Sequence, residues 1–123
     1  MKVIINADDF GYTKAVTEGI VEGYKKGIVR STTALCNMEY VEYGKDLIKD
    51  LPDLAVGVHL TLTLGKSLTQ NKTLTDEDGN FYKPAQLIHH VFDIEEVYQE
   101  FKAQIERYIE IFGHLPSHLD SHH

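Results

Sequence analysis

Cysteine is nearly absent from this chain of 123 residues, and tryptophan is missing altogether. The single cysteine, Cys36, cannot form a disulfide within the chain, which is typical of proteins from a reducing compartment. The first ten residues hold one lysine followed by two carboxylates, a pattern unlike that of a secretory signal peptide. We therefore expect a cytoplasmic protein in which Cys36 is an inert, buried residue of a strand.

Basic residues and long apolar runs are also scarce. Twelve Lys and Arg stand against nineteen Asp and Glu, which gives a net charge of −7 with neutral histidines. Binding to nucleic acid or to an anionic membrane requires clustered Lys and Arg, so this balance disfavours both partners. No stretch reaches the roughly 18 apolar residues that a membrane-spanning helix needs. The length suits a single domain over residues 1–123.

The remaining residues follow the alternating pattern of an α/β protein. Apolar runs predict strands over residues 3–7, 28–36, 54–62 and 117–122, and helical spacing predicts helices over residues 14–26, 39–51 and 93–112. Strands that alternate with crossover helices predict a parallel sheet with helices outside. The polar stretch between Leu62 and Pro84 has no period, and its length is typical of a functional or disordered loop.

The helix over residues 93–112 has the strongest pattern. Asp93 followed by Glu96 predicts an N-cap with its reciprocal partner, and Gly113 predicts the end of the helix. Before it, His89 and His90 are expected on the polar face of another helix. The apolar residues of the long helix predict one buried stripe, made of Val97, Tyr98, Phe101, Ile105, Tyr108 and Phe112.

Carboxylates and histidines gather near the ends of three predicted strands. Asp8 and Asp9 follow the first strand, His59 lies near the end of the third, and four of the seven histidines fall in the last ten residues. The carboxyl ends of parallel strands converge on one face, so we expect these side chains to meet. Two imidazoles and a carboxylate are a common ligand set for a divalent metal.

The strand period narrows the choice within the fourth strand. His118, Asp120 and His122 share one face of that strand. His122 is nearest the carboxyl end and is the preferred ligand there, while Asp120 is placed to orient an imidazole from behind. Each residue also has an ordinary explanation: the Asp8–Asp9 pair as a helix cap, His59 as a core histidine, and the final histidines as the stub of an expression tag.

Four motifs carry a resemblance to a known family: NADDFG at 6–11, GIVRSTTAL at 27–35, GVHLTLTLGKSLT at 57–69 and FGHLPSHLDSHH at 112–123. In order and spacing they resemble the YdjC-like carbohydrate deacetylases, and among these the bacterial chitooligosaccharide (chitin disaccharide) deacetylases. The resemblance implies the N-terminal half of a distorted TIM-like β/α barrel related to polysaccharide deacetylases. Family members continue past HLDSHH, so we expect residues 1–123 to be the N-terminal part of a longer deacetylase barrel.

The resemblance also implies an activity and residue roles. It implies a metal-dependent hydrolase that removes acetyl from N-acetylglucosamine units of small chitooligosaccharides, such as diacetylchitobiose, with Mg²⁺ as the expected metal and Zn²⁺ as the alternative. Asp8 matches the family's general base, and no residue here matches its general acid. The implied metal ligands are Asp9, His59 and His122. Residues expected behind the ligands or in contact with substrate are Asp120, His118 and Thr61.

Other functions stay open beside this one. The chain could be a non-catalytic metal-binding or sugar-binding fragment, or part of another metal-dependent hydrolase such as a phosphoesterase. Scarce Lys and Arg near the expected site favour a neutral sugar amide over a multiply charged phosphate. Loop 63–83 is a candidate sugar-contact surface, with Thr61, Thr63, Asn71, Phe81 and Tyr82 in or near it. A small N-acetylated sugar and a second copy of the chain in a homodimer are the expected partners.

Overall fold

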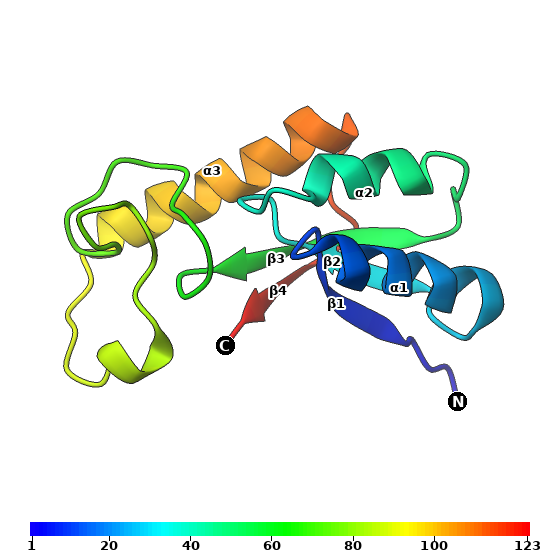
Figure 1. Cartoon of the computed structure of the whole chain (residues 1–123), viewed down its shortest axis with the longest axis horizontal. Helices are drawn as coiled ribbons and strands as arrows, with labels where there is room; N and C mark the ends of the chain where they lie inside the picture. The colour runs from blue at the N-terminus through cyan, green and yellow to red at the C-terminus, as the bar shows by residue number, and fades with distance from the viewer.

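Four parallel strands form one sheet in the order of the sequence. The computed structural model describes all 123 residues, and adjacent strands pair in parallel throughout. The strands are β1 (Asn6–Phe10), β2 (Ser31–Ala34), β3 (Ala55–Thr61) and β4 (Leu119–His122), and the helices are α1 (Lys14–Lys26), α2 (Val41–Ile48) and α3 (Ile94–Phe112). The predicted parallel sheet with outer helices is confirmed (Figure 1). No helix is both long and apolar enough to cross a membrane.

The first strand differs from its prediction in a way that matters for the site. The apolar run predicts a strand over residues 3–7, but β1 begins only at Asn6 and continues through Asp8 and Asp9 to Phe10, while residues 3–5 are exposed and lie before the strand. The pairing register with β2 shifts between Ala7 and Phe10, and Asp9 has a φ of 68°. The two aspartates therefore form a bulge inside the strand, where one extra residue bends the chain and re-aims its side chains.

The other elements are confirmed, with shorter bounds for most. Helix α1 matches its prediction, and Thr13 caps it by accepting a hydrogen bond from the Val16 amide. Strands β2, β3 and β4 and helix α2 lose residues at their ends, where regular hydrogen bonding stops. Cys36 lies just after β2 rather than in a strand. Burial raises the pKa of its thiol to about 12, which agrees with an inert residue.

The N-terminus of α3 is capped differently from the prediction. Asp93 is the N-cap and accepts from the Glu95 and Glu96 amides, but Glu96 is not its reciprocal partner. The Glu96 carboxylate instead accepts hydrogen bonds from the Thr73 amide and hydroxyl. The Thr73 hydroxyl accepts from the Asp93 amide at 2.9 Å. A loop residue thus replaces the expected partner.

The buried face of α3 is more polar than the predicted stripe. Tyr108 is buried and donates to the Val56 carbonyl oxygen at 2.9 Å, but Tyr98 is 59% exposed. The stripe prediction was therefore wrong in part. Tyr98 is exposed, and Glu100 and Gln104, which a helical pattern assigns to solvent, are buried. The buried residues of α3 are Glu100, Gln104, Tyr108 and Ile111.

Loop 63–83 is built around the buried carboxylate of Glu100. This carboxylate accepts from the Ser67 hydroxyl at 2.6 Å, from the Thr69 hydroxyl at 2.7 Å and from the backbone amide of Thr69 at 3.0 Å. Gln104 donates to the same carboxylate and also exchanges hydrogen bonds with the backbone N–H and C=O of Thr61. Helix α3 therefore ties the loop to the end of β3. In Figure 1 the loop projects past the carboxyl ends of β3 and β4.

Some loop residues predicted to meet a sugar are used inside the loop. Phe81 is only 2% exposed, and its backbone amide donates to the Gly65 carbonyl oxygen within the loop. Asn71 accepts from the Leu74 amide. His89 and His90 do not lie in a helix, because the only helical turn nearby is η1 (Pro84–Gln86). Phe81 and Asn71 therefore shape the loop from within.

Glu100→Gln is expected to destabilise the fold by roughly 1–3 kcal/mol, because the new amide group faces buried donors that lose their acceptor. Urea unfolding of the two proteins measures the difference. Glu106→Gln is the matched control, since Glu106 is an exposed carboxylate of the same helix near Lys102. Equal unfolding midpoints for the two variants would contradict the role of Glu100.

Candidate metal centre

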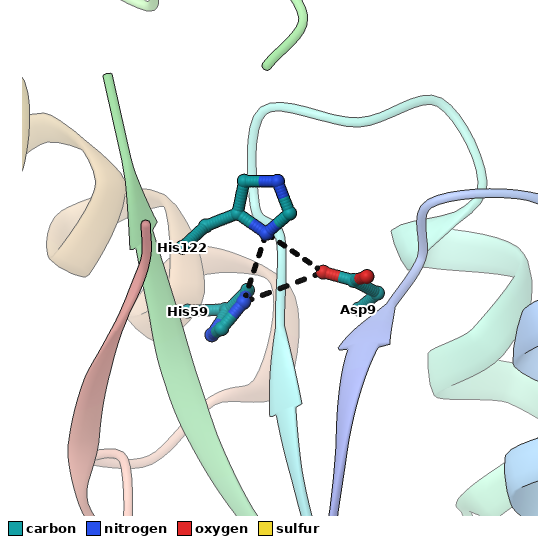
Figure 2. Close-up of side chains that lie close together, drawn as sticks. All are labelled: Asp9, His59 and His122. Carbon is teal, nitrogen blue, oxygen red and sulfur yellow. Dashed lines mark hydrogen bonds and ion pairs between the residues drawn. The ribbon is translucent and has the colours of Figure 1, made fainter. Parts of the chain in front are cut away.

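Three side chains from three strands meet at the carboxyl end of the sheet (Figure 2). Asp9 Oδ1 lies 3.3 Å from His59 Nε2 and 3.1 Å from His122 Nδ1. The two imidazole nitrogens are 3.2 Å apart. The predicted convergence of Asp9, His59 and His122 is therefore observed, while their role as ligands stays a prediction.

The spacing of these three atoms suits one small cation. Ligands about 2.1 Å from a metal are about 3.0 Å apart at neighbouring octahedral positions and about 3.4 Å apart at tetrahedral ones. In addition, Asp9 Oδ1 is buried and has no hydrogen-bond donor, which is costly for a carboxylate oxygen. A divalent cation between the three atoms would satisfy this oxygen, so the residues fit such an ion.

The bulge in β1 separates the two neighbouring aspartates. The left-handed φ of Asp9 is uncommon outside glycine, although aspartate tolerates it better than most residues. Asp9 is turned toward the two imidazoles, whereas Asp8 is exposed and accepts a hydrogen bond from Asn6 Nδ2 at 2.7 Å. Asp8 also belongs to a second close group, with His59 and Asp120. The two carboxylates are therefore placed for different tasks.

Asp120 holds the imidazole of His59 from behind. Asp120 Oδ1 lies 2.5 Å from His59 Nδ1, and the His59 side chain is almost fully buried. A carboxylate that accepts a hydrogen bond from Nδ1–H keeps the proton on Nδ1 and leaves the Nε2 lone pair free toward Asp9 and His122. This is the geometry expected for Asp120, and it replaces the alternative of a core histidine bonded to a backbone carbonyl. Asp8 and Asp9 are not the cap of the next helix, because Thr13 caps α1.

His122 is held toward its neutral form. Its pKa is lowered chiefly by burial, with the Asp9 carboxylate acting in the opposite direction and the two neighbouring histidines adding to the lowering. Burial removes the water that stabilises the imidazolium ion. A neutral imidazole is the form that can bind a metal.

Metal occupancy is expected to be constant near pH 8 and to fall below about pH 6, because protons then compete for the imidazoles. Because the pKa of His122 is lowered, protons compete for this imidazole only below the pH at which an ordinary histidine becomes charged. Equilibrium dialysis with Zn²⁺ at a series of pH values, with circular dichroism as the folding control, measures the effect. Full occupancy at pH 5 would contradict it.

The structure does not bring His118 to these three side chains, whereas Thr61 is paired with His122 in the register of β3 and β4. His118 lies before β4, where its Nε2 is 3.4 Å from the Ser31 hydroxyl. Its ring fills the space beside Gly57, where an added Cβ would lie 2.8 Å from the ring. Thr61 is buried, and its hydroxyl accepts from the Thr63 amide. A role for either residue behind the ligands or in contact with substrate stays a prediction.

Two residues near the cluster do not stand out in the sequence. Asn6 donates to Asp8, and the buried hydroxyl of Thr33 donates to Asp120 at 3.1 Å. Neither type stands out as a metal ligand or a base. The position of β2 could have indicated Thr33. This strand lies between β1 and β3, which carry site residues, and alternate residues of β2 face the same side of the sheet as those residues.

Comparison with known proteins places these motifs in a family. The sequence model described as YdjC-like protein matches residues 2–123. The chain is 50% identical to carbohydrate deacetylase 2 of Listeria innocua serovar 6a, over 99% of this chain and 50% of that protein. It is 43% identical to the chitooligosaccharide deacetylase of Salmonella paratyphi B, over 98% and 48%. The chain thus spans about half the length of these curated relatives.

A solved structure shares the fold. It is a candidate cellobiose-phosphate cleavage protein from Enterococcus faecalis V583, 46% identical, with a TM-score of 0.90 over 98% of this chain and 48% of that one. The four parallel strands and outer helices form half of a β/α barrel, as predicted. By sequence and by fold, the chain belongs to the YdjC-like protein family.

Proposed function

We propose that residues 1–123 supply the metal-binding part of the active site of a carbohydrate N-deacetylase. The observation that carries this proposal is the buried Asp9 Oδ1, which lacks a donor and faces two imidazoles. The names of the relatives support the reaction class. The proposed substrate is a small N-acetylated sugar such as diacetylchitobiose, and the products are acetate and the free amino sugar.

Asp9, His59 and His122 would hold the divalent cation. Mg²⁺ is the metal expected from the family resemblance, and the two imidazoles make Zn²⁺ the alternative to test beside it. When bound, such a cation polarises an amide carbonyl and makes a bound water more acidic.

The protein's own groups supply base and orientation. Asp8 is exposed, and its carboxylate is oriented by the Asn6 amide group, so it is available to remove a proton from the attacking water. Asp120 fixes the ring of His59. The group that protonates the leaving amine is not assigned to a residue of this chain.

The test measures acetate release from diacetylchitobiose by protein that contains residues 1–123, after chelation and after return of Mg²⁺ or Zn²⁺. Metal-dependent release supports the proposal. Sugar or metal binding without acetate release would instead favour a non-catalytic module. Cellobiose phosphate carries no acetyl group, so it is tested separately for release of glucose, because the related solved structure is named for its cleavage. A homodimer and a cytoplasmic location stay predictions.

A further inference from the structure

Strand β2 contributes no proposed ligand, yet one of its side chains lies behind His59, among the polar groups that surround Asp120. Thr33 is fully buried. Its hydroxyl oxygen lies 3.1 Å from Asp120 Oδ2, 3.3 Å from His59 Nδ1 and 3.4 Å from Asn6 Nδ2. One hydroxyl from β2 therefore contacts side chains from β1, β3 and β4.

The direction of these hydrogen bonds follows from what each group can donate. A hydroxyl has one proton and can accept two hydrogen bonds, and an ionised carboxylate only accepts. Thr33 therefore donates to Asp120 Oδ2, while Asp120 Oδ1 accepts a hydrogen bond from His59 Nδ1–H. Both carboxylate oxygens then have a donor, and the Asp120 side chain is held in one orientation.

We propose that Thr33 is a positioning residue for the metal site. Through Asp120 it keeps the proton of His59 on Nδ1, so that the Nε2 lone pair points at the space between Asp9 and His122. The Asp120 side chain is 34% exposed, so without the Thr33 hydroxyl its carboxylate is free to turn toward water. This proposal rests on the proposed function of the cluster as a metal site.

The neighbouring threonine provides a matched control. Thr32 is also fully buried in β2, and its hydroxyl donates to the Ala7 carbonyl oxygen at 2.6 Å. Successive side chains of a strand point to opposite faces, so Thr32 faces away from the site. Replacing either threonine with valine keeps the shape and removes one buried hydroxyl.

The experiment compares Zn²⁺ affinity, by competition with a chromophoric chelator, for the unmodified chain and for Thr33→Val, Thr33→Ser and Thr32→Val. Thr33→Val is expected to lose up to about 10–100-fold in affinity, the range for removing the direct outer partner of a metal-bound histidine, because Thr33 acts through that partner, Asp120. Thr33→Ser keeps the hydroxyl and is expected to keep the affinity. Thr32→Val is expected to lose stability without losing affinity.

A second measurement reads His59 directly and needs no metal. Nitrogen-15 NMR of the metal-free chain near pH 8 distinguishes a proton on Nδ1 from one on Nε2. The unmodified chain is expected to show the Nδ1 form, and Thr33→Val a mixture. If the unmodified chain binds no metal, the proposed function fails while the NMR comparison still tests Thr33. An unchanged tautomer in Thr33→Val, or equal losses of affinity in the two valine variants, would overturn the proposal.

Discussion

Asp9→Ala is expected to abolish binding of a divalent metal, and His59→Ala is expected to do the same. Among the three proposed ligands only Asp9 carries a negative charge, and its Oδ1 atom is buried. Two neutral imidazoles alone form a weak metal site. The loss should exceed the roughly 10–100-fold that removal of an outer partner costs. Elemental analysis after dialysis measures it.

His118→Ala is the control for these two variants, because His118 is a histidine of the same strand region that contacts Ser31 instead of the cluster. It is expected to keep its metal. Circular dichroism confirms that each variant is folded. Unchanged metal content in both Asp9→Ala and His59→Ala would refute the site.

Asp8→Asn is expected to keep the metal and to lose most of the turnover. The change removes the proposed base but preserves its size, and a positioned general base contributes about 10²–10⁴-fold to rate. Asp9→Asn should instead lose metal and activity together, because a neutral amide is a poorer ligand for a hard cation. Acetate release from diacetylchitobiose and metal content are measured on the same samples.

The outcome for this pair separates two errors. Loss of metal in Asp8→Asn together with retention in Asp9→Asn would mean that the two roles are reversed. Wild-type rates in both variants would remove the pair from catalysis altogether. The bulge in β1 argues against reversed roles, because only Asp9 is turned toward both imidazoles.

The convergence of the site could be predicted because parallel strands impose it. Once Asp9, His59 and His122 were placed near strand ends, the topology brought them together without knowledge of any contact. The bulge could not be predicted, because the apolar run ends at Ala7 while backbone pairing continues to Phe10. Hydrogen bonding to β2, rather than hydrophobicity, decides that boundary.

The buried polar residues could not be predicted from hydrophobic patterns either. Such patterns assign Glu100 and Gln104 to solvent, yet both are buried. Their hydrogen-bond partners lie more than thirty residues away in sequence, in loop 63–83 for Glu100 and at the end of β3 for Gln104. The role of Thr33 could not be predicted for a related reason. A threonine in a strand is common, and only its contacts with side chains of three other strands make it part of the site.

The contacts of Glu100 have a consequence for protein engineering. Loop 63–83 depends on acceptors from α3, since Glu100 binds Ser67 and Thr69 and Glu96 binds Thr73. Transplanting the loop alone into a relative would leave its hydroxyl and amide donors without acceptors wherever the host helix lacks these carboxylates. Loop and helix therefore form one exchangeable cassette, and chimeras that aim to change sugar preference should cross over before residue 63 and after residue 112.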